Sequence, residues 1–258
     1  MKYLIFVLTM LFSSFLTAGT IDPKVPAQKY LDYAKGFPCV LQIRGTYKES
    51  NFQGSCVVID PYHVLTAAHV VADSTSQFII HNGKEYPCDI VAINANYNAD
   101  KMSHHDIALC GLVKPIKLSF YPELYEDRDE VGKVCSMAGY GFTGDFTNGY
   151  NIKYDNKRRA GSNIIDSIDN NVLEYSVHKS PSTTLEFLIC SGDSGGGLFI
   201  GKKLAGIHSC VYATDRKTDS DYGDVGCSTR VSDYIEWIKK TKQIIKEIRE
   251  VDNAKKGL

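Results

Sequence analysis

Hydrophobic and polar positions alternate over short runs through most of the chain. Four runs rich in β-branched residues stand out, at 39–43, 55–59, 77–80 and 89–93. Turn-forming pairs separate them, among them Asn82-Gly83, which is typical of a two-residue hairpin. Short strands at this spacing predict an all-β domain, either a sandwich or a pair of barrels.

The periodicity changes near the C-terminus. Apolar residues recur there at helical spacing with charges between them: Tyr234, Ile235, Ile238, Ile245 and Ile248. This pattern predicts one amphipathic helix over roughly 233–250 that packs against the β domain. Asp233 and Glu236 have the spacing of a capping box at its start.

The N-terminus resembles a secretory signal peptide. Lys2 precedes the apolar run from Leu4 to Leu16, and small residues follow. A membrane anchor is the weaker alternative, because a spanning helix needs about 20 apolar residues. We therefore predict a signal-peptide segment over residues 1–19, with Ala18-Gly19 as the favoured cleavage site, and a secreted protein, extracellular or periplasmic.

Composition and charge narrow the function. The chain has 258 residues with 29 Lys+Arg against 30 Asp+Glu, a formal net charge of -1. This balance argues against sequence-independent binding to nucleic acid, which needs a basic surface. An even number of cysteines in an exported protein suggests disulfides, and their spacing fits no zinc site. The 8 cysteines are Cys39, Cys56, Cys88, Cys110, Cys135, Cys190, Cys210 and Cys227.

One glycine-rich segment carries a candidate nucleophile. Residues 192–196 read Gly-Asp-Ser-Gly-Gly, with Ser194 at the centre. The same residues satisfy the nucleophile elbow of α/β-hydrolases, a fold that requires the order serine, acid, histidine. After Ser194 the sole histidine is His208, which leaves no room for the intervening elements. The order of the residues therefore excludes an esterase of that fold.

Two upstream motifs complete a different pattern. His69 ends Thr-Ala-Ala-His, and Asp106 begins Asp-Ile-Ala-Leu. In the order His69, Asp106, Ser194 these motifs resemble the trypsin/chymotrypsin-like serine protease family. Further segments are similar at 139–141, 204–209 and 226–231, and the resemblance as a whole covers most of the mature chain. The resemblance implies two six-stranded antiparallel β-barrels with a C-terminal helix. It also implies a protease domain over 20–240, followed by an extension of the helix and a charged tail over 241–258.

The same resemblance implies a mechanism. Ser194 would attack the scissile carbonyl, His69 would accept and return the proton, and Asp106 would orient His69. The amides of Gly192 and Ser194 would form the oxyanion hole. No metal or organic cofactor is implied. Expected partners are protein or peptide substrates and possible protein inhibitors; the protein is expected to be monomeric, with no nucleic acid or membrane partner. The rival hypothesis is an inactive, protease-like binding protein.

Asp193 raises the question of activation. In the family this aspartate pairs with an N-terminal ammonium that proteolysis releases, usually on Ile or Val. This chain has no Ile-Val-Gly-Gly sequence, and Asp22-Pro23 follows Ile21. Either signal removal liberates a usable N-terminus, or another group holds Asp193.

The cysteines depart from the family pattern. Gly54 and Val70 stand where the family has the disulfide that brackets the catalytic histidine. Cys135 matches a family cysteine whose partner position holds Ile200 here. For five of the others two hypotheses remain: Cys190 pairs with Cys210 or Cys227, and Cys88 pairs with Cys110 on a neighbouring strand.

The residues of the substrate pocket leave two specificities open. Leu188 stands where trypsin carries its aspartate, Ile189 and Val211 add apolar bulk, and Gly226 leaves some space. This set favours a small or apolar residue before the cleaved bond. His208 instead resembles the histidine that glutamyl endopeptidases use for an acidic side chain, and Ser191 and Ser209 would add hydroxyl donors.

Overall fold

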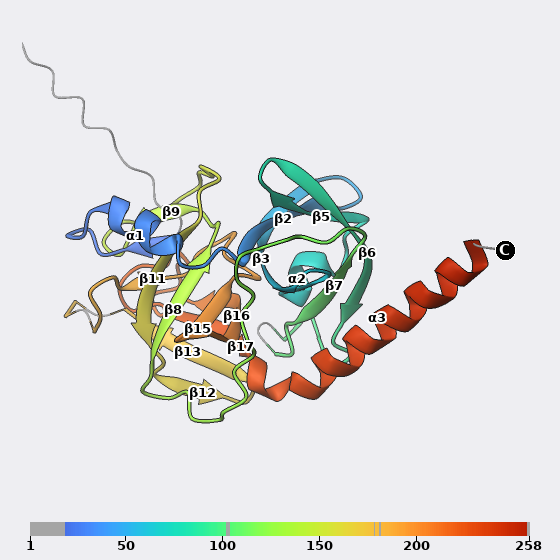
Figure 1. The fold of residues 1–258 in the computed structure, drawn as a ribbon. Coiled ribbons are helices and arrows are strands. Elements are labelled where there is room, and N and C mark those ends of the chain that lie inside the picture. Colours follow the sequence, from blue (N-terminus) through green and yellow to red (C-terminus); the bar gives the residue numbers. More distant parts are fainter. Residues whose placement is uncertain (1–18, 102–103, 178, 181, 257–258) are drawn as a thin grey trace, which may run out of the picture.

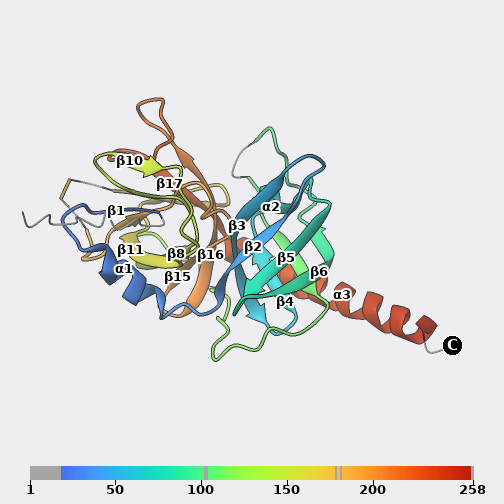
Figure 2. The ribbon, with the colours of Figure 1, turned by 90° about the horizontal axis from the view of Figure 1, so that it is seen from above.

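The structure is a computed structural model that describes residues 19–101, 104–177, 179–180 and 182–256. Two β-rich halves lie side by side, and a long helix leaves the junction between them along the outside of the first half (Figures 1 and 2). The all-β fold class with a C-terminal helix is therefore confirmed.

The first half is a closed barrel with the strand order β2-β3-β4-β7-β6-β5. All six neighbouring pairs are antiparallel. The four β-branched runs of the sequence lie largely within β2, β3, β5 and β6, which confirms those predictions. The strands are β2 (Val40–Thr46), β3 (Asn51–Asp60), β4 (His63–Thr66), β5 (Ser76–His81), β6 (Lys84–Ile93) and β7 (Ala108–Leu112).

The predicted hairpin joins β5 to β6. Asn82 has φ 50° and Gly83 has φ 70°, so both residues of the turn are left-handed. A two-residue turn with this conformation matches the twist of the strands on either side, and Asn-Gly tolerates it well. The sequence thus specifies this corner of the barrel locally.

The second half is an antiparallel seven-stranded sheet with the order β11-β8-β15-β16-β17-β13-β12. Its strand count differs from the six that the family resemblance implies, because the short strand β12 extends the edge through a hairpin with Asn170 at φ 53°. The strands are β8 (Val134–Gly139), β11 (Arg159–Ile164), β12 (Ser167–Asp169), β13 (Val172–Ser176), β15 (Gly197–Ile200), β16 (Lys203–Tyr212) and β17 (Val225–Arg230).

A small four-stranded sheet surrounds the start of the described chain. Strand β1 (Gly19–Ile21) lies between β9 (Thr143–Asp145), which runs parallel to it, and β14 (Phe187–Leu188), which runs antiparallel. Strand β10 (Gly149–Asn151) completes the sheet, and helix α1 (Ala27–Ala34) follows and packs against β11. Neither β1 nor α1 was predicted, because both are too short to show a clear periodicity.

The C-terminal helix is longer than predicted and begins later. A 3₁₀ turn, η1 (Val231–Asp233), precedes α3 (Ile235–Lys256). Ile238 and Ile245 are buried on the inner face of α3. Asp233, predicted as a helix cap, lies in the 3₁₀ turn, and its carboxylate contacts Arg128 at 2.5 Å. The apolar pattern thus located the helix, whereas its start is set by this turn.

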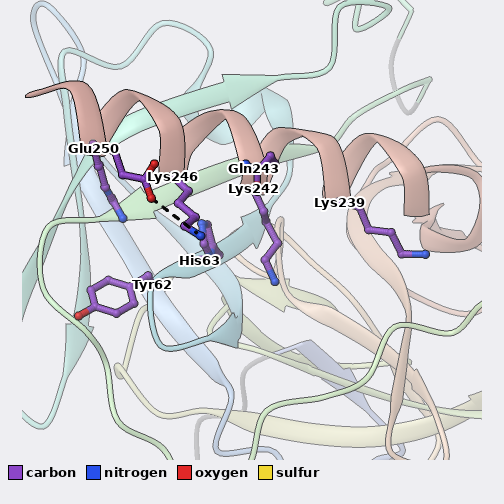
Figure 3. A pocket seen from close by; sticks show the side chains of 8 residues that line it. Tyr62, His63, Lys239, Lys242, Gln243, Lys246 and Glu250 are labelled. Carbon is purple, nitrogen blue, oxygen red and sulfur yellow. Dashed lines mark ion pairs between the residues drawn. The ribbon is translucent and has the colours of Figure 1, made fainter.

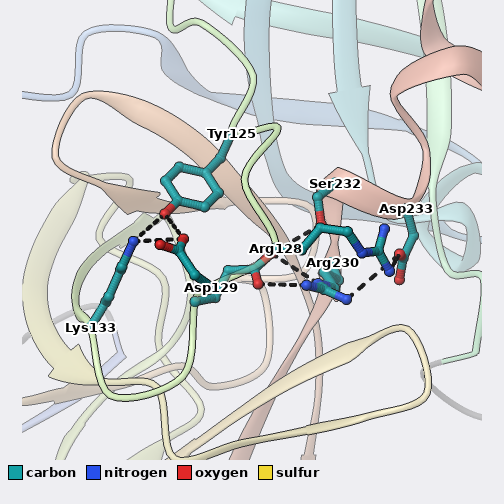
Figure 4. Close-up of polar contacts among 8 residues, drawn as sticks. Tyr125, Arg128, Asp129, Lys133, Arg230, Ser232 and Asp233 are labelled. Atoms are coloured by element: carbon teal, nitrogen blue, oxygen red, sulfur yellow. Dashed lines mark hydrogen bonds and ion pairs between the residues drawn. The ribbon is translucent and has the colours of Figure 1, made fainter.

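A buried ion pair anchors the junction between β17 and α3. Arg230 donates two hydrogen bonds to Glu130, at 2.8 and 2.6 Å, and the Ser232 hydroxyl adds a third at 2.9 Å (Figure 4). Glu130 is fully buried. Removing one partner of such a pair leaves an uncompensated charge and costs about 3–5 kcal/mol. The loop before β8 is thereby tied to the base of the helix.

Candidate active site

The three predicted catalytic residues come from both halves. His69 lies in the single-turn helix α2 (Ala68–Val71), directly after β4, and Asp106 lies just before β7, so both belong to the first barrel. Ser194 lies in the loop between β14 and β15 of the second half. Two hydrogen bonds join this loop to β3: the Ser55 amide donates to the Ser194 carbonyl at 2.9 Å, and the Ser55 hydroxyl donates to the Gly192 carbonyl at 2.9 Å.

His69 and Asp106 form a tightly bonded pair. Nδ1 of His69 lies 2.7 Å from Oδ2 of Asp106, and the His69 amide donates to Oδ1 at 2.9 Å. The Ser209 hydroxyl donates to Oδ2 at 2.5 Å. With Nδ1 donating to the carboxylate, Nε2 of His69 carries the free lone pair that a general base needs. This arrangement fixes the tautomer that the mechanism requires.

The electrostatics of the pair suit a base. Burial lowers the pKa of His69, but the hydrogen bond and the charge of Asp106 outweigh it, so that pKa is raised overall. Burial raises the pKa of Asp106, and the opposing contacts with His69 and Ser209 lower it overall. Asp106 therefore stays ionised while it supports a more basic imidazole.

Ser194 lies in the same pocket as His69. The pocket holds about 300 Å³, and both side chains line it. The Ser194 hydroxyl donates to the Ser209 carbonyl at 3.4 Å, which is a long hydrogen bond. Among the described residues no hydrogen bond joins this hydroxyl to His69, and catalytic hydrogen bonds often tighten only when substrate binds.

The backbone around Ser194 depends on glycine. Gly192 has φ 92° and Gly195 has φ 83°. A Cβ on Gly195 would overlap the Thr66 hydroxyl and the Ser55 carbonyl. In the described part of the chain, the amides of Gly192 and Ser194 donate no hydrogen bond. The loop therefore leaves two backbone donors available for an oxyanion.

Asp193 is fully buried beneath this loop. Its carboxylate accepts the amides of Gly141 at 2.8 Å and Cys190 at 3.0 Å. A Cβ on Gly139 or Gly141 would overlap the carboxylate, which explains the glycines of that segment. Burial raises the pKa of Asp193 to about 6, although both amides oppose the rise. A cation beside this group would stabilise its charged form.

Strand β1 brings the start of the described chain close to Asp193. The Gly19 backbone hydrogen-bonds the Cys190 thiol, which itself contacts the Asp193 side chain. Thr20 lies opposite Leu188 and donates to the Ser220 carbonyl at 2.6 Å. Two contacts thus connect Gly19 to the buried carboxylate.

The predicted substrate-binding residues fall into two groups. Ile189, Ser191, Ser209 and Val211 line the pocket with Ser194 and His69. Leu188, His208 and Gly226 are buried and are not among the described residues that line it. The space left by Gly226 is filled, because a Cβ there would overlap the Tyr175 ring and lie 2.8 Å from Leu188.

His208 is held inside the second half. Its Nδ1 lies 3.0 Å from the Ser228 hydroxyl, and its ring is fully buried. Burial lowers the pKa of His208 to about 3, so the ring is neutral at physiological pH. A neutral imidazole offers no charge to an acidic substrate side chain.

Several lining residues were not predicted from the sequence. Three come from β10 and from the long loop between β16 and β17, where turn-rich composition gives little positional signal, and the two cysteines come from the Ser194 loop and from β16. These residues are Tyr150, Cys190, Cys210, Thr218 and Ser220.

A larger cavity of about 610 Å³ lies between α3 and the outside of the first barrel, which contributes Tyr62 and His63 to its lining (Figure 3). Its cationic side chains have acidic partners: Lys242 contacts Asp60 at 2.6 Å, and Arg249 contacts Asp89 at 2.6 Å. The cavity shares none of its described lining residues with the pocket of Ser194.

One group of carboxylates has the spacing of a cation site. Ligand oxygens of Asp219, Asp221 and Asp224 lie within 4.8 Å of one another. Asp224 accepts the amides of Thr214 at 3.2 Å and Ser220 at 3.0 Å, so these bonds already account for its position. Asp224 thus helps to shape the loop beside the pocket.

Comparison with known proteins agrees with this geometry. The Trypsin family model matches residues 30–238. The chain belongs to the trypsin family. As a member of the trypsin family it is a serine endopeptidase.

Individual relatives of the trypsin family are distant. Kallikrein-1E2 of Equus caballus is 24% identical over 230 residues, covering 76% of this chain and 82% of the relative. Snake venom serine protease KN14 of Trimeresurus stejnegeri is 27% identical over 217 residues, covering 73% of this chain and 76% of the relative.

Two solved structures share the fold. HL collagenase has a TM-score of 0.65 at 17% identity, with 80% of this chain and 94% of that chain covered. Mouse neuropsin has a TM-score of 0.64 at 22% identity, with 80% of this chain and 95% of that chain covered.

Proposed function

We propose that the protein is an exported serine endopeptidase that cleaves after small or apolar residues, using Ser194, His69 and Asp106. The observation that carries the proposal is the bonded His69–Asp106 pair, whose histidine lines the same pocket as Ser194. The amides of Gly192 and Ser194 donate no hydrogen bond to any described residue. A serine hydroxyl is a weak nucleophile without an adjacent base, and this arrangement supplies one.

The reaction proceeds in two halves. Oγ of Ser194 bonds to the scissile carbonyl carbon while its proton passes to Nε2 of His69. The amides of Gly192 and Ser194 stabilise the oxyanion; as the C–N bond breaks, His69 returns the proton to the leaving amine. Water then attacks the acyl-enzyme with His69 again as base, which releases the acid and restores Ser194.

Activation is proposed to follow from removal of the signal peptide. A cut between Ala18 and Gly19 creates an α-ammonium on Gly19, at the end of β1 that adjoins Cys190 and Asp193. An ammonium there would pair with the buried carboxylate of Asp193. This pair would hold the Gly192 loop in the conformation that leaves its amides available for an oxyanion. No further propeptide cleavage would then be needed.

Small or apolar specificity is favoured by the walls of the pocket. Ile189 and Val211 line it, while Leu188 and the Tyr175 ring fill the space beside Gly226. The acidic alternative depends on His208, whose neutral, buried ring argues against it.

Export is supported by the apolar N-terminal sequence and by the venom origin of one relative. Within residues 19–256, apart from the short undescribed gaps, no helix has the length and apolarity to cross a bilayer. Protein or peptide substrates follow from the endopeptidase activity, and we propose a monomer that a protein inhibitor could regulate.

The test is the intact mass of the secreted protein with and without a fluorophosphonate. We expect a single adduct on the wild type and none on Ser194→Ala. The mass of the unlabelled protein should correspond to a chain that begins at Gly19. Absence of an adduct on folded protein beginning at Gly19 would favour the inactive, protease-like binding protein instead.

Specificity is tested with peptides that differ only at the residue before the cut. We expect Ala, Val and Leu to exceed Glu in kcat/KM, with the ranking unchanged in His208→Val. A strong preference for Glu that His208→Val abolishes would establish the acidic specificity. Val211→Gly is the matched variant within the pocket, and we expect it to admit larger apolar residues.

A further inference from the structure

Two cysteines face each other across the strands beside the pocket. Cys210 of β16 lies directly opposite Cys227 of β17 in the antiparallel register. Their thiols contact each other. Opposed residues of antiparallel strands have Cα atoms about 4.5–5.5 Å apart, within the range that a disulfide spans. The sequence had left Cys190 as a possible partner of either.

The register of the two strands shifts at this point. His208 pairs with Ser228 and Cys210 pairs with Cys227, so two steps along β16 match one step along β17. Ser209 is therefore the extra residue of a β-bulge. Bulges re-aim side chains, and this one presents the Ser209 hydroxyl to Asp106 at 2.5 Å and its carbonyl to Ser194 at 3.4 Å.

The bulge has a direct connection to the pocket. Cys210 itself lines the cavity with His69 and Ser194, whereas Cys227 is fully buried behind it. A covalent bond at Cys210 would thus fix the residue that follows the bulge and limit how far Ser209 and Val211 can move.

We propose that Cys210 and Cys227 form a cross-strand disulfide that fixes the Ser209 bulge, so that substrate binding depends on thiol oxidation. This inference rests on the proposed endopeptidase activity and export for its function. The disulfide itself depends only on the two thiols and an oxidant.

The oxidant is a small-molecule or protein disulfide, such as oxidised glutathione. The Cys210 thiolate attacks one sulfur of that disulfide, which releases one thiol and forms a mixed disulfide. Cys227 loses its proton and attacks the Cys210 sulfur, which releases the second thiol. Two protein thiols are oxidised by two electrons, and the oxidant is reduced to two thiols.

The properties of the thiols agree with this order. Contact with Cys227 lowers the pKa of Cys210, although burial opposes it. Cys210 is also the more exposed of the two. Cys190 is engaged elsewhere, because its thiol donates to the Phe142 carbonyl at 2.9 Å.

A second pair provides a matched control. Cys88 and Cys110 lie on β6 and β7 of the first barrel, and their thiols also contact each other. Neither lines the pocket in the described part of the chain. Breaking a disulfide there would remove a crosslink without touching the bulge.

The first experiment maps the linkage. Purified protein is treated with oxidised glutathione, capped with N-ethylmaleimide and digested without reduction. We expect a linked peptide that joins Cys210 to Cys227. A linkage from either cysteine to Cys190, or maleimide on both thiols after oxidation, would overturn the proposal. The map does not require an active enzyme, so it separates this inference from the proposed function.

The second experiment measures kcat and KM before and after reduction. Reduction of the wild type is expected to raise KM about fivefold with kcat changed less than about twofold, since loosened binding raises KM alone. C210S/C227S should show the raised KM without a response to reductant. If the serines disturb folding, C210A/C227A is used instead, with the same expected result. C88S/C110S should respond as the wild type does. Equal KM values for oxidised and reduced wild type would refute the role in substrate binding.

Discussion

The two halves of the protein contribute to the site in different ways. The first barrel closes on itself through continuous strand pairing, and His69 and Asp106 are bonded at its rim. The second half supplies Ser194 and most of the pocket from loops, whose geometry depends on a bulge and on close approaches that only glycine allows. The proposed base therefore has a rigid support, whereas the proposed nucleophile and the pocket depend on single residues.

The largest expected effect tests whether the halves act as one unit. Ser194→Ala and His69→Ala each remove one partner of the proton transfer, one from each half. Each should lower kcat by about 10⁶-fold, and the double variant should be no worse, as for residues that act together. Single-turnover and steady-state kinetics on one peptide measure kcat for all three variants.

Thermal unfolding provides the control, because Ser194→Ala should leave the melting temperature nearly unchanged. If the losses in the double variant multiplied instead, His69 and Ser194 would act independently and the proposed mechanism would be wrong.

The next effect isolates the second half. A protein that begins at Gly19 is compared with one that carries an added N-terminal alanine. We expect the extension to lower kcat/KM by about 10²–10³-fold, the cost of a misplaced oxyanion donor. Activity of the Gly19 protein should also fall at alkaline pH, because the ammonium then loses its proton and no longer pairs with Asp193.

Asp193→Asn serves as the partner variant. It should lower activity in the Gly19 protein to a similar extent and abolish the difference between the two N-termini. Equal activity of the two N-termini in the wild type would show that another group holds Asp193.

A smaller effect concerns the contact between the halves. Ser209→Ala removes a hydrogen bond to the Asp106 carboxylate, and we expect kcat/KM to fall about tenfold, as for a bond to a charged group. The raised pKa of His69 places the acidic limb of the wild-type profile above its usual range of about 6.5. Activity is lost as pH falls through that value, because the base becomes protonated.

Ser209→Ala should move the acidic limb of the profile to still higher pH. Without the Ser209 hydroxyl, the Asp106 carboxylate has one hydrogen-bond donor fewer and interacts more strongly with protonated His69. A pH profile of kcat/KM decides this point, and an unchanged limb would show that Ser209 contributes through packing alone.

The smallest effect compares the stability of the halves. Gly83 in the first barrel has φ 70° and Gly201 in the second has φ 60°, and neither position would crowd a Cβ. Alanine at either should cost about 1 kcal/mol, the strain of a left-handed residue. Equal shifts of one calorimetric transition would show that the halves unfold together, whereas two transitions would show separate units; activity should not change.

Much of the first barrel could be predicted because its signals are local. β-branched runs and the Asn82-Gly83 turn specify strands and a hairpin without reference to the rest of the chain. Strand β1 carries no such signal, since three residues of undistinguished sequence become a strand by lying between β9 and β14.

The site divides in the same way. The motifs around His69, Asp106 and Ser194 identify these residues from short stretches of sequence, although their contacts come from distant parts of the chain. The pocket does not follow from motifs, because the burial of His208 and the pairing of Cys210 depend on the register of β16 and β17. Register is a property of two strands at once, and a single strand's sequence does not contain it.

The bulge at Ser209 also constrains how this pocket can change over evolution. Along a strand, odd and even positions face opposite sides, and one extra residue exchanges them. A deletion of one residue at this point would restore strict alternation and send the side chains of 210 and 211 to the wrong sides. Variation in this wall should therefore proceed by replacement of side chains, while the count of residues between His208 and Cys210 stays fixed.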